Sequence, residues 1–160
     1  MALEKYYRED HTDLRRLKEE CINHRIAMYI QENFLATPSH ELCEPAEKIK
    51  SGKIKVDVEY DKAADQQKTI EGKSSRPDIL IHHRGDNTDN FAFFELKKNY
   101  RSERDSEKCR GAKCSPYSYT HVLIIDCLIK EIESVRIIEF LANGSEKIHK
   151  YANRSSHYQP

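Results

Sequence analysis

The chain has 160 residues, of which 38% are hydrophobic and 34% charged, and its 27 lysines and arginines balance its 27 aspartates and glutamates. This length fits one domain with one core, and the clear apolar runs exclude a disordered chain. Net neutrality excludes binding of a polyanion through overall charge, so any attraction for nucleic acid must come from local clusters of lysine and arginine.

The sequence also argues against a membrane or secreted protein. No apolar stretch approaches the ~20 residues of a membrane span, and the N-terminal residues lack the apolar core of a signal peptide. The five cysteines are an odd number without a CxxC pair, which argues against a disulfide framework and a structural zinc site. We therefore expect a cytoplasmic protein without a membrane partner.

The first third of the chain is expected to form a long helix followed by a strand. Between about residues 12 and 35 apolar residues recur every three or four positions, the spacing of a helix with one broad buried face. Residues 37–52 are expected to form a loop with a short helical turn at 44–49. From 53 to 61 the period changes to two, which predicts a half-buried strand.

The middle of the chain is expected to contain a β-hairpin. Residues 62–76 are polar and are predicted to form a flexible excursion. Residues 77–83 and 91–98 are predicted strands, and the turn residues 84–87 make the link between them short. An antiparallel hairpin is the simplest arrangement for two strands joined in this way.

The last third is expected to add a helix, two strands and a tail. Residues 99–113 are highly charged and are predicted to form a helix with loops. The apolar runs 121–128 and 135–141 predict two more strands. Residues 143–160 are polar, and we expect one amphipathic turn followed by disorder. Together these elements predict a single α/β domain.

Three charged side chains on the predicted hairpin indicate a hydrolytic site. Glu95 and Lys97 are two residues apart on one strand, so they project from one face while Leu96 packs on the other. Asp78 begins the neighbouring strand, and antiparallel pairing can bring its carboxylate within a few ångströms of Glu95. Adjacent carboxylates repel unless a cation lies between them, and such oxygen ligands suit Mg²⁺ or Mn²⁺. The pattern predicts phosphodiester hydrolysis, with Lys97 orienting water or stabilising the transition state.

The alternative for Glu95 and Lys97 is a solvated strand face with a cross-strand salt bridge. The aromatic residues that precede them, in the segment 91–94, indicate a central strand and so favour the site.

The segments RPDILIHHRG (76–85) and FAFFELKKN (91–99) resemble the PD-(D/E)XK, or restriction endonuclease-like, nuclease superfamily, in its small single-domain bacterial form. The resemblance covers roughly residues 12–140. It implies a restriction endonuclease-like core, a mixed central β-sheet flanked by helices, spanning about 12–141 of a single domain 1–160.

The resemblance also implies roles for individual residues. Asp78 and Glu95 would bind Mg²⁺ or Mn²⁺, the Leu96 carbonyl would join them, and Lys97 would be the catalytic lysine. Many members carry a further glutamate on the first helix, and EECINHRIAMYIQ (19–31) is similar to that segment. Glu20 is the candidate there and Glu19 the fallback.

Other charged residues have two open interpretations. Glu59 shares a strand face with Asp57 and Asp61, and would either reach the metal or its water or be an edge-strand surface acid. Several basic residues follow the active-site strand and would place positive charge along a nucleic-acid backbone, or else form a solvated charged helix. These residues include Lys98, Arg101, Arg104 and Lys108.

The function that these expectations favour is a Mg²⁺-dependent DNA endonuclease, acting alone, as a homodimer or in a larger complex. One alternative is a non-catalytic module that binds nucleic acid or protein on the same fold. Another is an RNA-directed nuclease or a nuclease subunit of a larger defence or repair complex. The intact set of Asp, Glu and Lys argues against the binding module.

Overall fold

The computed structural model of the chain describes residues 2–11, 16, 18–36, 44–59, 62–63, 66–67, 69–70, 73–130 and 132–150. Its helices and strands, in chain order, are α1 (Ala2–Glu9), α3 (Glu19–Ala36), α4 (Glu44–Lys50), β1 (Lys55–Val58), β2 (Lys62–Ala63), β3 (Gln66–Gln67), β4 (Thr69–Ile70), β5 (Lys73–Ser74), β6 (Ile79–His82), β7 (Ala92–Leu96), α5 (Glu103–Lys113), β8 (His121–Asp126), the 3-10 helix η2 (Ile132–Ser134), β9 (Arg136–Phe140) and β10 (Glu146–Lys150).

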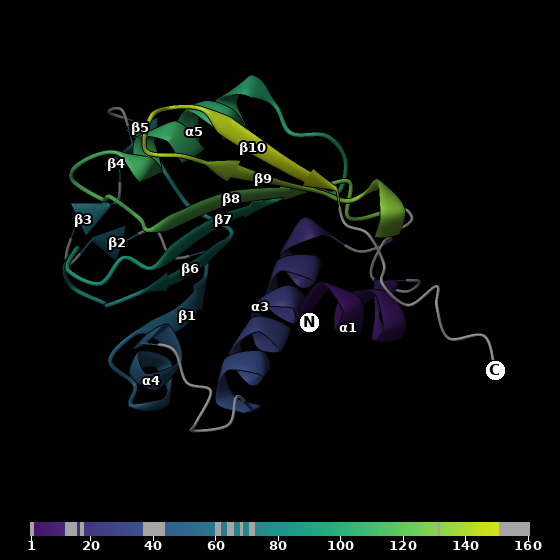
Figure 1. The fold of residues 1–160 in the computed structure, drawn as a ribbon, viewed down its shortest axis with the longest axis horizontal. Coiled ribbons are helices and arrows are strands. Elements are labelled where there is room, and N and C mark those ends of the chain that lie inside the picture. Colours follow the sequence, from purple (N-terminus) through teal and green to yellow (C-terminus); the bar gives the residue numbers. More distant parts are fainter. Residues whose placement is uncertain are drawn as a thin grey trace.

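A six-stranded mixed sheet forms the centre, in the strand order β1-β6-β7-β8-β9-β10 (Figure 1). Strands β7 and β8 are parallel, with α5 in the connection between them, and every other neighbouring pair in this sheet is antiparallel. Helices α1 and α3 lie against one face and α5 against the other. The expected α/β class, with a mixed sheet flanked by helices, is confirmed.

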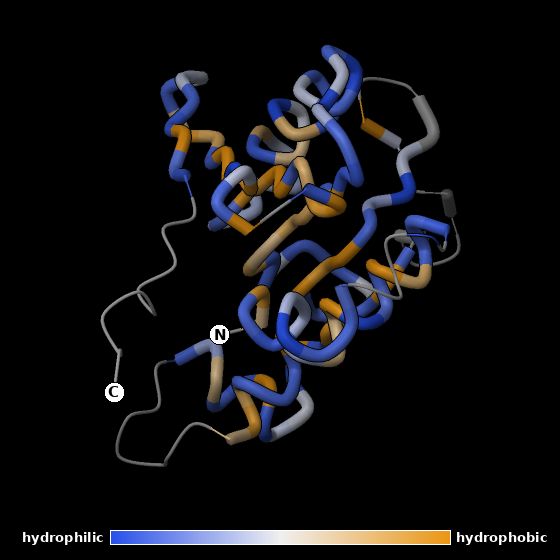
Figure 2. The backbone as a smooth tube through the Cα atoms, turned by 90° about the vertical axis from the view of Figure 1, so that its right-hand side faces the viewer, coloured by the Kyte–Doolittle hydropathy of each residue, from blue (hydrophilic) through white to orange (hydrophobic). Residues whose placement is uncertain are grey.

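The sheet separates two apolar layers. On one side Ile22 of α3 packs against Ile79 of β6, and on the other Cys109 of α5 packs in a cluster with Leu80. Ile79 and Leu80 are sequence neighbours that face opposite layers, as the period of two in a strand requires. Burying one such aliphatic side chain contributes about 2 kcal/mol. Figure 2 shows the hydrophobic stretches in the interior and hydrophilic residues around them.

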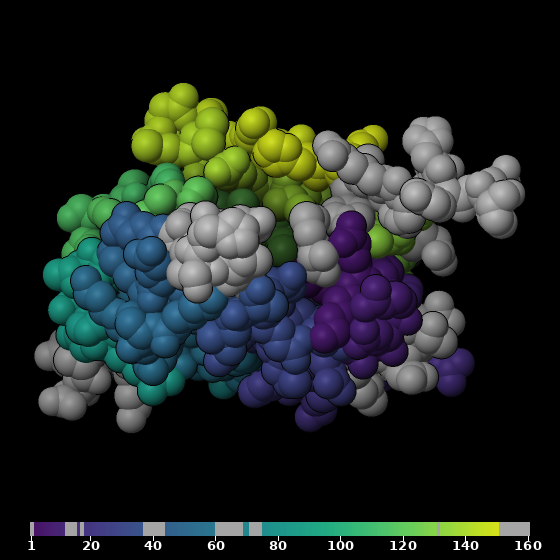
Figure 3. Space-filling model, turned by 60° about the horizontal axis from the view of Figure 1, so that its bottom comes forward, coloured from purple at the N-terminus to yellow at the C-terminus, as the bar shows by residue number. Residues whose placement is uncertain are grey.

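The predicted hairpin is confirmed, and the short helical turn at 44–49 is helix α4. Strands β6 and β7 pair antiparallel, with Ile79 opposite Phe94 and Ile81 opposite Ala92. On the face seen in Figure 3, α4, α3 and α1 lie in a row. None of the helices in the described part of the chain has the length and apolar character that a membrane span requires.

The prediction of one amphipathic turn followed by disorder is wrong for residues 143–150. Strand β10 pairs with β9 in an antiparallel ladder, after a turn in which Gly144 has a φ of 81°. In that turn the Asn143 side chain accepts hydrogen bonds from the backbone and hydroxyl of Ser145. Polar residues can form β10 because it is an edge strand with mostly exposed side chains. Residues 151–160 lie outside the described residues.

The N-terminal region also differs from the prediction. The long helix begins at Glu19, whereas the apolar spacing predicts a start near residue 12, and residues 12–15 lie outside the described part. Helix α1 precedes it and buries Leu3 and Tyr6 against α3 and the sheet, while Tyr7 donates a 3.0 Å hydrogen bond to the Leu128 carbonyl. The predicted excursion contains two short hairpins, β2–β3 and β4–β5.

Asp57 on edge strand β1 is buried in a polar network that connects β1 to the end of β6 and to Arg84 beyond it. Its carboxylate accepts two hydrogen bonds from the Arg84 guanidinium, and its Oδ2 lies 3.2 Å from His82 Nε2. Burial alone would raise the pKa of Asp57, but the hydrogen bonds from Arg84 and His82 hold it well below its usual range. The charged form of Asp57 therefore stabilises the fold.

We expect Asp57→Asn to lower the free energy of unfolding near neutral pH by about 2 kcal/mol, because the charged hydrogen bonds to Arg84 are lost. A depressed folded-state pKa contributes stability that is present above the unfolded value of about 3.9 and is lost as pH falls. The loss caused by the substitution should therefore shrink below about pH 4 in urea titrations.

The exposed substitution Glu47→Gln on α4 is the control and should change stability by less than about 0.5 kcal/mol. An equal loss for Asp57→Asn at neutral and acidic pH would contradict the role given to the charge.

Candidate active site

Lys97 lies at the centre of a cluster of carboxylates. Its Nζ is 3.3 Å from Glu95 Oε2 and 3.6 Å from Asp78 Oδ2, the two acids of the β6–β7 hairpin. The same nitrogen is 3.4 Å from Asp105 Oδ1 on α5 and 3.7 Å from Glu19 Oε1 on α3. Both helical layers and the sheet thus contribute a carboxylate to one ammonium group.

Asp78 is held in place by two hydrogen-bond donors. Asn23 of α3, which is 1% exposed, donates from Nδ2 to Asp78 Oδ1 over 3.0 Å. The backbone N–H of Leu96 donates to Asp78 Oδ2 over 2.7 Å, so the Leu96 backbone lies beside this carboxylate. The side chain of Leu96 is fully buried in the opposite layer, next to α3. These bonds fix the orientation of Asp78 toward Glu95 and Lys97.

Glu95 is a buried carboxylate between two lysines. Its side chain is 2% exposed, its Oε2 faces Lys97, and its Oε1 forms a short ion pair with Lys108 Nζ. This burial excludes the alternative of a solvated strand face. Burial and then the charge of Asp78 raise the pKa of Glu95 to about 7, although the two lysines offset part of the increase.

The charge state of Lys97 follows from the same surroundings. Burial by itself would lower the pKa of Lys97, but Asp78, Glu95, Asp105 and Glu19 raise it above the usual lysine value. Lys97 is therefore a permanent cation at neutral pH. It can stabilise negative charge and donate hydrogen bonds, but it cannot act as a general base there.

The start of α5 positions two further members of the cluster. Ser102 is the N-cap, and a capping box links it to Asp105, whose Oδ2 accepts a 2.8 Å hydrogen bond from the Ser102 backbone. Lys108 follows three residues after Asp105 and therefore lies on the same side of the helix. Its Nζ reaches Glu95 and also donates a 2.7 Å hydrogen bond to the Arg76 carbonyl.

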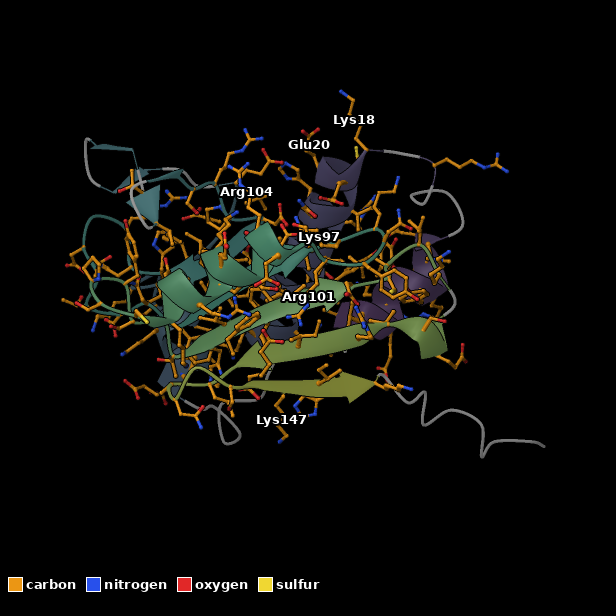
Figure 4. All side chains as sticks on the ribbon, turned by 90° about the horizontal axis from the view of Figure 1, so that it is seen from above. Lys18, Glu20, Lys97, Arg101, Arg104 and Lys147 are labelled. Carbon is orange, nitrogen blue, oxygen red and sulfur yellow. The ribbon has the colours of Figure 1, made fainter. Side chains whose placement is uncertain are left out.

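The cluster opens into a polar cavity of about 280 Å³ between α5 and the segment that leads into β6. Besides the cluster, this polar cavity is lined by residues that include Ser75, Arg76 and Arg104. The Ser75 hydroxyl is buried and has no hydrogen-bond partner within the described residues. Figure 4 shows Lys97 and Arg104 on the same side of the molecule. The cavity is thus small, polar and lined by both acids and cations.

The two glutamates considered on the first helix are placed differently. Glu19 faces the cluster, where its carboxylate contacts Lys97 and accepts a 3.2 Å hydrogen bond from the Lys98 backbone. Glu20 is exposed and points outward from the start of α3 (Figure 4). Glu19 is one helical turn from Asn23, on the stripe that faces the sheet, whereas Glu20 is rotated by about 100° from it. The structure therefore brings Glu19, and not Glu20, to the cluster around Lys97.

Glu59 lies near the cluster but outside the lining of the polar cavity. Strand β1 ends at Val58, and Glu59 has a φ of 52°, so it does not continue the face of Asp57 as the alternation predicts. Its Oε2 is 3.3 Å from an Arg76 nitrogen, and its backbone N–H donates to the Asp78 carbonyl. Its contacts are those of a residue that supports the loop around Asp78.

The four basic residues predicted to contact nucleic acid lie in different places relative to the polar cavity. Arg104 is exposed at the polar cavity, and Lys108 reaches into it. Arg101 is ion-paired with Glu146 on β10 over 2.5 Å, which directs it to the far edge of the sheet. Lys98 is half-buried beside Glu19. Arg104 and Lys108 are therefore the two that face the site.

Asn23 and Asp105 belong to the cluster, and neither is predicted from the sequence to be a site residue. The signal for Asn23 is a polar residue on the buried stripe of α3, between Ile22 and Ile26. The signal for Asp105 is its position three residues after Ser102, which is the spacing of a capping box. Neither signal reveals the contact with Asp78 or Lys97, because that contact depends on the packing of helices on the sheet.

Two carboxylates of the cluster are of the kind that could hold a small divalent cation. No group of three or more His, Cys, Asp or Glu side chains within the described residues is arranged as a complete metal site. Mg²⁺, however, takes one or two protein carboxylates and keeps several waters. Asp78 and Glu95 supply the two carboxylates. Four acids contact Lys97, and one of them, Glu95, also contacts Lys108.

No family model, no curated protein and no solved structure matches this chain. The geometry and charge of the cluster are therefore the features that indicate a function.

We expect Glu95 to titrate with a midpoint near pH 7 in buffer free of divalent cations. The titration is measured by NMR from the ¹³C resonance of its side-chain carboxyl group. Asp78→Asn removes a neighbouring negative charge, so the midpoint should fall but stay above the ordinary glutamate value, because burial remains. A raised pKa favours folding at low pH, so this contribution to stability is lost as pH rises from about 4.3 through the folded-state pKa.

A wild-type midpoint at the ordinary glutamate value, or no change in Asp78→Asn, would contradict the close approach of these two carboxylates.

Proposed function

We propose that this chain is a metal-dependent nuclease that hydrolyses phosphodiester bonds in DNA, on a restriction endonuclease-like core. The observation that carries the proposal is the convergence of Asp78 and Glu95 on the Lys97 ammonium at the end of the β6–β7 hairpin. The chain order α3, β1, β6, β7, α5, β8 is also the order of elements in the core of the PD-(D/E)XK superfamily, which the sequence resembles.

Asp78, Glu95 and the Leu96 carbonyl would hold the cation in this site. When bound, Mg²⁺ supplies Lewis-acid stabilisation of the phosphate and lowers the pKa of a water. Lys97 stays protonated and stabilises negative charge on the phosphate in the transition state. Asn23 holds Asp78 in position by donating a hydrogen bond from Nδ2 to Asp78 Oδ1. The other oxygen of Asp78, Oδ2, is directed toward Lys97.

The charge around the polar cavity supports a phosphate substrate. Arg104 is exposed at the cavity, and Lys108 lies deeper beside Glu95. These positive side chains beside the acids would attract a nucleic-acid backbone and place one phosphate near Lys97. The overall charge of the chain is zero, so this local arrangement supplies the attraction.

We expect the wild type to cut plasmid DNA with Mg²⁺ or Mn²⁺ and not with EDTA. Lys97→Met should slow cleavage by at least about a hundredfold, because a preorganised cation is lost from the reacting phosphate. Lys147→Met is the matched control, since Lys147 is exposed on β10, far from Lys97 in Figure 4, and its cleavage rate should match the wild type. Rates are read from gels, and circular dichroism confirms that each variant is folded.

Cleavage by Lys97→Met at the wild-type rate would overturn the assignment of the site. No cleavage by the wild type of plasmid, single-stranded DNA or RNA with either metal would overturn the nuclease and favour a binding module on the same fold.

A further inference from the structure

Lys108 occupies the side of Glu95 that faces away from Lys97. Its ammonium forms a short ion pair with Glu95 Oε1, donates to the Arg76 carbonyl and lies 5.8 Å from the centre of the Phe93 ring. The Lys108 side chain is 19% exposed and Glu95 is 2% exposed. Little solvent therefore screens the ion pair, and Lys108 serves as a counter-cation for the most deeply buried acid of the site.

The two lysines differ in how firmly the fold holds them. Lys97 is surrounded by four carboxylates from different parts of the fold. If its ammonium moves away from one carboxylate, it stays close to the others. Lys108 contacts a single carboxylate of the cluster and one backbone carbonyl, that of Arg76, at the end of a flexible four-carbon stem that begins on α5. The polar cavity beside it has room for the side chain to turn away from Glu95.

We propose that Lys108 is a displaceable counter-cation, which neutralises Glu95 until a divalent cation takes its place. The inference rests on the proposed function, because it assumes that Glu95 is a metal ligand. The ammonium and a divalent cation near Glu95 repel each other, so Lys108 leaves Oε1 as the metal enters. Lys108 thereby lowers the metal affinity of the site and keeps a buried acid paired in the metal-free protein.

Arg104 offers a matched control for the effect of charge alone. It lies one helical turn before Lys108 on α5 and lines the same polar cavity. It has no ion pair with a carboxylate of the cluster within the described residues. Substituting either residue by Met removes one positive charge from the cavity, but only Lys108→Met removes the competitor from Glu95.

The test is titration calorimetry with Mg²⁺ alone, without nucleic acid, on the full chain. Wild type, Lys108→Met, Lys108→Arg and Arg104→Met are compared at about pH 8.5 and again at about pH 9, so that protonation of Glu95 does not limit binding. We expect Lys108→Met to bind Mg²⁺ about tenfold more tightly than the wild type, the effect of losing one charged hydrogen bond to the acid. Lys108→Arg should stay close to the wild type, and Arg104→Met should change affinity by less than about twofold.

Equal tightening by Lys108→Met and Arg104→Met would overturn the proposal, because it would show an effect of overall charge. Unchanged or weaker binding by Lys108→Met, with normal binding by the wild type, would overturn the role of Lys108 while leaving the metal-dependent nuclease intact. No Mg²⁺ binding by any variant would remove the metal site and, with it, both proposals. If Lys108→Met does not fold, as judged by circular dichroism, Lys108→Gln takes its place in the same comparison.

Discussion

The charge of Lys97 is the interaction on which this site depends. Glu95 is almost completely buried, and an isolated charge in such a place would be strongly unfavourable. Lys97 makes the burial possible by contacting four carboxylates that come from the hairpin, from α3 and from α5. Both helical layers are therefore connected to the sheet by the same group that we assign to catalysis.

The fold keeps like charges closer together than they would remain in solution. Burial and then the nearby charge of Asp78 raise the pKa of Glu95, because both disfavour its ionised form. Strand β7 can hold Glu95 there because it has a paired neighbour on each side and an apolar layer on each face. Perturbed acids of this kind cluster at functional sites, because a binding or catalytic task compensates for their effect on stability.

The sequence predicts the sheet better than the helices that complete the site. The hairpin strands are short apolar runs that are almost wholly buried and are joined by turn residues, so the hairpin can be located from the sequence. The choice between Glu19 and Glu20 depends on the rotation of α3 relative to the sheet, which apolar spacing defines only to within a residue or two. Strand β10 is missed because an edge strand with exposed side chains lacks an apolar period, and pairing with β9 decides its conformation.

We propose that Asp78 and Glu95 hold a divalent cation beside Lys97, where a phosphate of the substrate binds. Anomalous scattering from crystals grown with Mn²⁺ and a short phosphorothioate oligonucleotide tests it most directly. We expect an anomalous peak within bonding distance of both carboxylates and of a phosphate oxygen, with the Lys97 ammonium next to that phosphate. A site without a peak at saturating Mn²⁺, or a cation bound elsewhere with the oligonucleotide away from Lys97, would contradict it.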